Sequence, residues 1–244
     1  MSDLLVIVPS MGRPENAKAL LEAFAATDAQ CDLLFALELN DPKYHDYFQF
    51  EHIYPYEVIA MHSPTRGMAY PLNRAASFHA DNYEFFGFMG DDHRPRTHKW
   101  DNHVEEVLGM LQTGIAYGND LHQGEGLPTA AFMTKDIVIE LDGMVPQTFR
   151  HLYIDNFWLK LGQDLKRLQY LPMMIIEHLH PVFGTAQMDE GYKAVNAPEI
   201  YSADAHAFSA YIASQEYANL ILTLRSRFRV CCPPEACTGV CEAY

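Results

Sequence analysis

Two adjacent carboxylates and an imidazole follow a short apolar run of the sequence. Asp91, Asp92 and His93 come directly after residues 84–89, which are rich in phenylalanine and predict a strand. Neighbouring carboxylates repel one another unless a cation or hydrogen-bond donors offset their charge. Oxygen ligands suit Mg²⁺ or Mn²⁺, and Mn²⁺ also tolerates imidazole. These residues therefore indicate a divalent-metal site, and the alternative is a strand end whose carboxylates cap the following turn.

Two histidines lie at the end of another predicted strand, residues 171–180. His178 and His180 are separated by one residue, so the period of two in a strand places them on the same face. Either imidazole could reach an ion shared with the acidic pair. The alternative is a pair of surface or core-edge histidines, since the chain contains 12 histidines.

Asp155 is a candidate general base. It lies in the first turn of a helix predicted over residues 153–161, where the helix dipole stabilises a carboxylate. The flanking aromatic residues Tyr153, Phe157 and Trp158 could desolvate the carboxyl group and raise its pKa into the range useful for proton abstraction. The alternative is a purely structural role at the start of the helix.

A turn with anion-binding character follows the first predicted strand. Pro9, Ser10, Gly12 and Arg13 separate residues 4–9 from a helix that Pro14 opens. The segment has neither the G-x-x-x-x-G-K of a P-loop nor the G-x-G-x-x-G of a dinucleotide site. These two enzyme classes are therefore not supported, and a plain structural turn is the alternative.

The elements that must position these residues alternate between strand and helix in the first half of the chain. Strands are predicted over residues 4–9, 33–39, 56–61 and 84–89, and helices from residue 14, over 67–80 and after residue 100. Such alternation indicates crossover units in a mainly parallel sheet, which binds ligands beyond the carboxyl ends of its strands. Residues 9–13, 38–41, 62–67 and 90–94 occupy those positions. The second half predicts strands at 114–117 and 129–133 and a terminal helix over 204–229.

Composition limits the class of protein. Acidic residues outnumber basic ones by 32 to 17, giving a formal charge of −15, which disfavours a nonspecific nucleic-acid binder. A local basic face formed by Arg94, Arg96 and Lys99 is the exception to consider. No stretch approaches the roughly 18 apolar residues of a membrane span, and no signal peptide is recognisable, so we expect a cytoplasmic protein.

The cysteines are concentrated in a tail. Only Cys31 lies in the body, and the other four are Cys231, Cys232, Cys237 and Cys241. Their spacing lacks the paired C-x-x-C of common zinc sites, so we expect a loosely ordered tail of thiols. A small metal knot or an oligomer clasp is the alternative.

Taken in order, these motifs resemble the GT-A superfamily of glycosyltransferases, particularly family-two-like enzymes and small phage-encoded members. The resemblance extends from about residue 4 to about residue 193. It rests on the 8–13 turn, Arg66-Gly67, Asn73-Arg74-Ala75, Gly90-Asp91-Asp92-His93, Ile154-Asp155-Asn156, Glu177-His178-Leu179-His180-Pro181 and Asp189-Glu190-Gly191-Tyr192.

The resemblance implies an α/β fold with a GT-A-like, Rossmann-type, mainly parallel sheet flanked by helices. A smaller mixed acceptor-side region and a C-terminal helix would complete it. We expect one catalytic domain over residues 1–200, with a nucleotide-binding half at 1–113 and an acceptor and metal half at 114–200. A helix over 201–230 and a Cys-rich tail at 231–244 would follow.

The same resemblance implies roles for individual residues. The nucleoside would be held by Pro9, Ser10 and Arg13, together with a carboxylate from Glu38 or Asp41. Arg66 and Asn73 would lie near the base, the ribose or the diphosphate.

The acidic pair and the later histidines are similar to the superfamily's metal site. Asp91 and Asp92 resemble the D-x-D element, one contacting the ribose or donor sugar and the other the metal. His93 stands where a final carboxylate would be, so the metal ligand is either Asp92 or His93. His178 or His180 resembles the later metal ligand, and Asp155 resembles the base of inverting members.

The implied activity is the Mn²⁺- or Mg²⁺-dependent transfer of a sugar from a UDP- or GDP-linked donor to an acceptor hydroxyl, with inversion. A protein or glycan acceptor is favoured, duplex DNA is disfavoured by the net charge, and a DNA base is a further alternative. Residues 119–128 and 181–193 could close over the donor or acceptor, and a phage-encoded enzyme would act in the host cytoplasm. Competing interpretations are a sugar-nucleotide nucleotidyltransferase, a non-catalytic nucleotide-sugar-binding protein and a structural or oligomer-forming protein.

Overall fold

The computed structural model describes residues 2–63, 67–184, 192–193 and 197–228. Within these residues, eight strands form a single sheet in the order β3-β2-β1-β4-β7-β6-β8-β5. The strands are β1 Leu4–Ser10, β2 Asp32–Glu38, β3 Glu57–Met61, β4 Phe85–Phe88, β5 His93–Pro95, β6 Ile115–Asn119, β7 Ala131–Thr134 and β8 Leu168–His178.

The sheet is parallel through its first half and mixed in its second. Strands β3, β2, β1 and β4 pair in parallel, as do β6 and β8, whereas β7 runs antiparallel to both of its neighbours and β5 antiparallel to β8. The α/β class and the mainly parallel, helix-flanked sheet expected from the sequence are confirmed. The carboxyl ends of β1, β4, β6 and β8 share one edge of the sheet, where the predicted functional residues follow.

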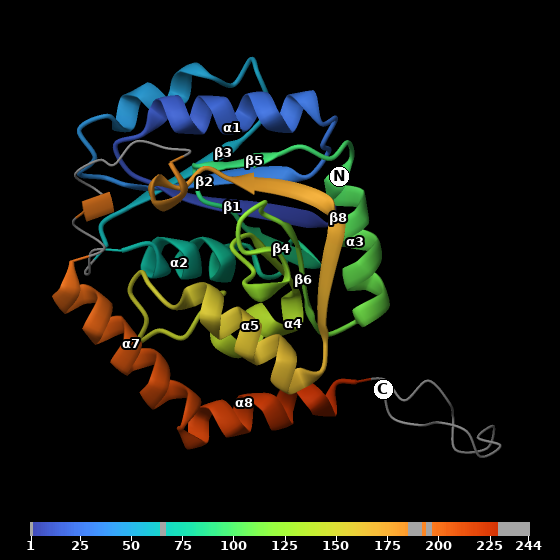
Figure 1. The fold of residues 1–244 in the computed structure, drawn as a ribbon. Coiled ribbons are helices and arrows are strands. Elements are labelled where there is room, and N and C mark those ends of the chain that lie inside the picture. The colour runs from blue at the N-terminus through green and yellow to red at the C-terminus, as the bar shows by residue number, and fades with distance from the viewer. Residues whose placement is uncertain (1, 64–66, 185–191, 194–196, 229–244) are drawn as a thin grey trace.

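Helices cover both faces of the sheet (Figure 1). Helices α1 (Pro14–Ala26) and α3 (Trp100–Leu111) pack on one face, and α2 (Ala69–His79), α4 (Lys135–Leu141) and α5 (Ile154–Leu165) pack on the other. Residues 4–8 are buried on both faces of β1, which explains why this strand is apolar without alternation. Pro14 occupies the first turn of α1, where its missing N–H costs nothing.

The C-terminal helical region is divided into two helices rather than the one expected over residues 204–229. These are α7 (Pro198–Ile212) and α8 (Gln215–Ser226), which together cover α4 and α5 (Figure 1). The hydroxyl of Ser214 accepts a hydrogen bond from the backbone N–H of Tyr217, so Ser214 caps the start of a new helix.

Other elements differ from expectation in ways that concern the site. Strand β5 and helix α4 were not predicted, nor were the short 3₁₀ helices η1 (Tyr44–Gln49), η2 (Gly124–Gly126) and η3 (Pro181–Phe183). Strand β8 begins at Leu168 and ends at His178, so the predicted strand over 171–180 is wrong at its end. No helix in the described segments combines the length and the hydrophobicity needed to cross a bilayer.

Candidate functional site

The acidic pair and the later histidine motif meet at the carboxyl edge of the sheet. Asp92 Oδ1 lies 3.6 Å from His178 Nε2 and 3.4 Å from His93 Nδ1. Within the described part of the chain, these three side chains each place a ligand atom within 4.8 Å of the others. Two motifs that are distant in the sequence therefore form one cluster with the spacing of a metal site.

The short strand β5 brings this cluster together. It pairs antiparallel with β8 and places His93 directly opposite His178, and the two imidazole rings stack at 4.3 Å with an interplanar angle of 10°. The backbone N–H of Leu179 donates to the carbonyl of Asp92 at 3.0 Å, and that of His178 donates to the carbonyl of Asp120 at 3.2 Å. His178 is thus held by backbone pairing on both sides rather than by a flexible loop.

His93 is better placed to support His178 than to bind an ion. Its Nδ1 accepts a hydrogen bond of 2.9 Å from the backbone N–H of Gly90, so that lone pair is already used. Its Nε2 is buried and has no hydrogen-bond partner among the described residues. Burial and the neighbouring His178 lower the pKa of His93, which keeps the ring neutral. Asp92 and His178 are the two side chains that offer unused lone pairs.

The electrostatics of Asp92 favour a cation. Burial acts to raise the pKa of this carboxyl group, but its contact with His178 outweighs burial and holds the pKa well below its usual range. An ionised carboxylate is therefore present in a partly enclosed position, beside a histidine nitrogen.

Asp91 points away from this cluster and into the protein. It is 4% exposed, and it accepts hydrogen bonds from the hydroxyl of Ser10 at 2.5 Å and from the amide of Asn16 at 3.2 Å. Arg13 lies 3.7 Å from the same carboxylate. Burial and the charge of Asp92 raise the pKa of Asp91 to about 6. Asp91 thus ties the end of β4 to the turn between β1 and α1.

The turn after β1 is organised by a tyrosine that the sequence analysis missed. Tyr47, which is buried in η1, places its hydroxyl 2.8 Å from that of Ser10 and accepts the backbone N–H of Arg13 at 2.9 Å. Asp41 accepts the N–H of Gly12, whose φ of +72° favours glycine. Ser10, Arg13, Asp41 and Asp91 therefore belong to one network.

Two other predicted nucleotide-side residues flank this turn. Pro9 pairs with Ala36 inside the sheet, and Glu38, at the end of the neighbouring strand β2, accepts the backbone N–H of Ser63 at 3.1 Å. The carboxyl end of β2 thus lies beside the carboxyl end of β1. Arg66, another predicted donor contact, lies outside the described residues.

The Asn73 side chain makes hydrogen bonds that the sequence did not indicate. Its side chain is 2% exposed and makes three hydrogen bonds to backbone groups of Met144 and Val145. Gly143 adopts a φ of +150° against the same amide, and a Cβ there would approach the Asn73 side chain to 2.4 Å. These contacts hold the turn at residues 143–145, and the expected contact of Asn73 with the donor stays a prediction.

Asp155 opens α5 near the same edge of the sheet. Burial raises the pKa of its carboxyl group, while the backbone N–H of Asn156 and the charge of His178 act in the opposite direction. The interaction with His178 places Asp155 within electrostatic reach of the metal-site candidate.

His180 follows the strand, and its ring lies 5.1 Å from that of His178, but its nitrogens are not among the clustered ligand atoms. Its Nε2 lies 3.0 Å from the hydroxyl of Tyr192, and its Nδ1 accepts the backbone N–H of Val182 at 3.3 Å. Of the two histidines considered as metal ligands, the structure places His178, and not His180, beside Asp92.

Two more residues near the site were missed because long-range contacts define them. Asp204 on α7 is 3% exposed and accepts the backbone N–H groups of His151 and Leu152 at 3.2 and 2.8 Å. Burial lowers the pKa of His151 to about 4, and its ring interacts electrostatically with Asp204, Arg13 and Asp92. No local spacing in the sequence distinguishes either residue.

The residues proposed as a local basic face do not form one. Arg94 is 7% exposed and donates to the carbonyl groups of Asp91 and His93 at 2.8 and 2.6 Å. Arg96 pairs with Glu177, and Lys99 pairs with Asp28. The three cations therefore stabilise the fold around β5 and α3 rather than form a joint anion-binding surface.

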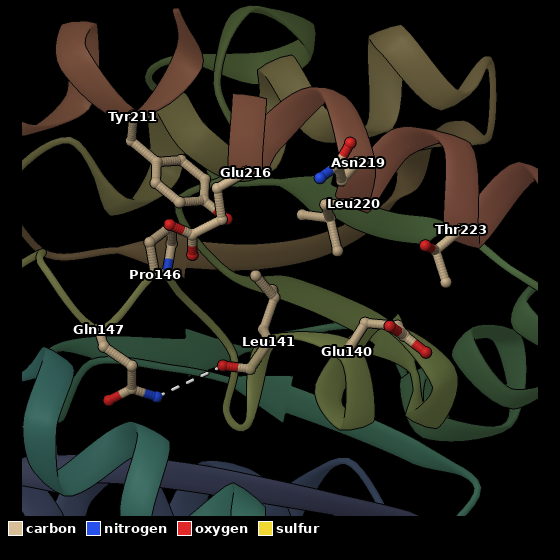
Figure 2. Close-up of a pocket in the computed structure, with 9 residues that line it drawn as sticks. All are labelled: Glu140, Leu141, Pro146, Gln147, Tyr211, Glu216, Asn219, Leu220 and Thr223. Carbon is tan, nitrogen blue, oxygen red and sulfur yellow. Dashed lines mark hydrogen bonds between the residues drawn. The ribbon is translucent and has the colours of Figure 1, made fainter. Parts of the chain in front are cut away.

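A pocket between α4 and α8 lies apart from this site. Figure 2 shows its apolar floor of Leu141, Tyr211 and Leu220, with Glu140 and Glu216 beside it. Its volume is about 180 Å³, and none of the clustered acids and histidines lines it.

Comparison with known proteins gives a similarity of fold. No protein-family model matches the sequence, and no curated protein matches it significantly. Among solved structures, glucosyl-3-phosphoglycerate synthase from Mycobacterium tuberculosis, in complex with Mn²⁺, UDP and phosphoglyceric acid, aligns with a TM-score of 0.56 at 10% identity over 84% of this chain and 78% of that chain. Its complex with Mn²⁺, UDP and glucosyl-3-phosphoglycerate gives a TM-score of 0.55 at 9% identity, over 84% and 79% of the two chains.

A third structure extends over more of the chain. A candidate nucleotide-diphospho-sugar transferase from Desulfovibrio desulfuricans G20 aligns over 92% of this chain and 99% of that chain, with a TM-score of 0.48 at 13% identity. With its curled, mostly parallel sheet and its helices on both faces, the chain has the α/β fold of the GT-A nucleotide-sugar transferases.

Proposed function

We propose that the protein is a metal-dependent glycosyltransferase that moves a sugar from a nucleoside-diphosphate sugar to an acceptor hydroxyl. The observation that carries this proposal is the contact between Asp92 and His178 at the ligand edge of a GT-A-like sheet. The fold neighbour that was solved with Mn²⁺ and UDP supports the same class of donor and ion.

The donor set of the cluster suits a divalent transition metal. Asp92 supplies an ionised oxygen and His178 a ring nitrogen, and Mn²⁺ accepts this combination more readily than Mg²⁺, which prefers oxygen ligands alone. When bound, the cation offsets the negative charge that develops on the leaving diphosphate. His93, stacked against His178, fixes the orientation of the ligand ring.

The turn at Pro9, Ser10 and Arg13 is the proposed nucleoside-binding edge. Tyr47, Asp41 and Asp91 hold this turn through hydrogen bonds, so its shape is set before a ligand arrives. Glu38 lies at the end of the adjacent strand and provides a carboxylate for ribose hydroxyls. A UDP-linked donor is our first expectation, and a GDP-linked donor is the second.

Asp155 is the proposed base. Burial raises its pKa, which makes the carboxylate a stronger proton acceptor than an exposed aspartate. It would take the proton of the acceptor hydroxyl as that oxygen attacks the anomeric carbon from the face opposite the diphosphate, so the product would be inverted.

A thermal-shift panel of UDP, GDP and their sugars, with and without Mn²⁺, tests the proposal. We expect one nucleotide series to raise the melting temperature only when Mn²⁺ is present, because the ion and the diphosphate bind together. Asp92→Ala and His178→Ala should abolish this Mn²⁺-dependent shift.

The matched controls are Asp81→Ala and His98→Ala, which remove an exposed aspartate and an exposed histidine away from the cluster. Both should shift as the wild type does. An equal Mn²⁺-dependent shift in Asp92→Ala would contradict the assigned metal site. Stabilisation by nucleoside triphosphates with no response to nucleotide sugars would favour a nucleotidyltransferase instead.

A further inference from the structure

His151, in the loop that leads into α5, has a ring nitrogen without a hydrogen-bond partner. Its Nδ1 atom is buried, and no described residue forms a hydrogen bond with it. Most buried polar atoms in folded proteins are paired, because leaving one unpaired costs free energy. An imidazole that the fold does not use for its own hydrogen bonds is a candidate for contact with a ligand.

The two ring nitrogens of His151 differ in exposure. The residue is partly exposed, and Nε2 does not belong to the buried nitrogens that lack a partner. Since no described residue forms a hydrogen bond with Nε2 either, this is the nitrogen that solvent can reach. The single proton of a neutral imidazole is better placed on Nε2, where the N–H can be hydrated, than on the enclosed Nδ1. His151 therefore presents an N–H donor at the protein surface.

The surroundings of His151 keep its ring neutral. Burial is the largest influence and lowers the pKa of His151 to about 4. Among the charged groups around the ring, Asp204 and Asp92 act to raise this pKa, and Arg13 acts to lower it. The imidazole is therefore uncharged at neutral pH. A neutral N–H donor suits the hydroxyl groups of a sugar, whereas phosphate oxygens are bound more strongly by cations.

The backbone that carries His151 is held by two helices. Asp204 of α7 accepts the backbone N–H of His151 at 3.2 Å. The carbonyl of Arg150 accepts the backbone N–H of Ala69, at the start of α2, at 2.9 Å. Gly67 lies so close to this loop that a Cβ on it would be 2.4 Å from the Arg150 carbonyl oxygen and 3.2 Å from His151 Cβ. The imidazole thus extends from a backbone in a fixed position, as selective recognition requires.

The neighbours of His151 locate it within the candidate site. Its ring interacts electrostatically with Asp92, the proposed metal ligand, and with Arg13, in the proposed nucleoside-binding turn. Four residues later, Asp155 lies in the first turn of α5 as the proposed base. In the proposed transfer, the anomeric carbon is bonded to the diphosphate and attacked by the hydroxyl at the base, so the donor sugar lies between these two groups. His151 therefore belongs to the part of the site that would surround the sugar.

We propose that His151 is a specificity-determining residue, which donates a hydrogen bond from its Nε2–H to a hydroxyl oxygen of the donor sugar. This inference rests on the proposed function and deepens it, because it names a residue that distinguishes a nucleotide sugar from the free nucleotide. A site that hydrogen-bonds a substrate hydroxyl discriminates against ligands without that hydroxyl, since its own polar group is then left unpaired.

Isothermal titration calorimetry of the full-length protein with Mn²⁺ tests this role of His151. The probes are UDP and GDP, together with UDP-glucose, UDP-galactose, UDP-N-acetylglucosamine and GDP-mannose. His151→Ala should weaken the binding of the preferred nucleotide sugar about tenfold, which corresponds to about 1.4 kcal/mol, and should change the affinity for the free nucleotide by less than about twofold. Because both affinities are measured on the same variant, unchanged binding of the free nucleotide shows that the site is still folded.

Two further variants separate the hydrogen bond from the loss of side-chain volume. His151→Gln keeps an N–H donor near the position of Nε2 and should restore most of the affinity for the nucleotide sugar. His98→Ala removes an exposed histidine away from the candidate site and should leave both affinities unchanged.

The outcomes distinguish a failure of this inference from a failure of the proposed function. The role of His151 is overturned if His151→Ala binds the nucleotide sugar as tightly as the wild type, or if it weakens the free nucleotide to the same extent. In both cases the wild type still binds a nucleotide sugar with Mn²⁺, so the proposed function stands. If the wild type binds no nucleotide sugar, the transferase proposal and the role of His151 fail together.

Discussion

Asp91 and Asp92 are adjacent in sequence, yet their surroundings differ. Asp91 is enclosed by hydrogen-bond donors from the turn after β1 and from α1, and its pKa is raised to about 6 by burial and by the neighbouring charge. Asp92 turns towards His178, and its pKa is held well below the usual range. Surroundings that move the pKa values of two neighbouring carboxyl groups in opposite directions indicate separate roles. Asp91 shapes the nucleotide edge, and Asp92 presents charge to a cation.

Replacing Asp155 tests its proposed role as the general base. Asp155→Asn should lower the transfer rate by about 10²- to 10⁴-fold, the usual contribution of a general base, while nucleotide-sugar binding is retained. The measurement is product formation with saturating donor, next to a thermal shift with the same donor. The comparison is Gln163→Ala, which removes an exposed side chain further along the same helix and should leave the transfer rate unchanged. Turnover in Asp155→Asn equal to the wild type would exclude Asp155 as the base.

At the scale of elements, the site depends on contacts that local sequence patterns do not contain. The sheet edge was predictable because buried strands are apolar and because ligands bind where parallel strands end. The three-residue strand β5 has no pattern of its own, and only its pairing with β8 shows that His178, and not His180, lies beside Asp92. In the same way, a hydrogen bond of Asn73 reaches a turn 71 positions away in the chain, which no spacing argument could locate.

Helix α7 offers a test of such a long-range contact. Asp204→Ala should lower the free energy of unfolding by about 1–3 kcal/mol, because two backbone N–H groups before α5 lose their buried partner. Asp204→Asn keeps an acceptor oxygen and should recover most of the loss. Urea unfolding measures both, with Glu199→Ala, an exposed acid on the same helix, as the control. If Asp204→Ala lowers the free energy of unfolding no more than the control does, the hydrogen bonds to Asp204 do not stabilise this turn.

At the scale of the whole molecule, buried histidines link stability to pH. His93, His151 and His180 all have pKa values lowered mainly by burial, and that of His151 falls to about 4. Below about pH 6.5, these histidines therefore bind protons in the unfolded chain but not in the folded chain. The free energy of unfolding falls as the pH drops towards 4. Asp91 acts in the opposite sense, since its raised pKa lets the folded state bind a proton between about pH 6 and 4.

The contribution of His151 can be measured by comparing how the free energy of unfolding changes with pH in the wild type and in a His151 variant. Between pH 7 and pH 4.5, the wild type should lose more stability than His151→Gln, by about 2 kcal/mol, because the imidazole is protonated near pH 6.5 in the unfolded chain but only near pH 4 in the folded one. Urea unfolding at the two pH values gives the difference directly. His98→Gln removes an exposed histidine and should follow the wild type. Parallel slopes for the wild type and His151→Gln would show that the imidazole of His151 is not desolvated.

The pairing of β5 with β8 has a consequence for biosynthesis. A chain emerging from the ribosome carries Asp92 well before His178, so the two ligands cannot meet until the last strand has docked at the sheet. A cation that needs both residues binds only the finished fold, and its binding stabilises that fold against partly assembled forms. Metal uptake would then report that synthesis has passed β8 and that the final strand is in register.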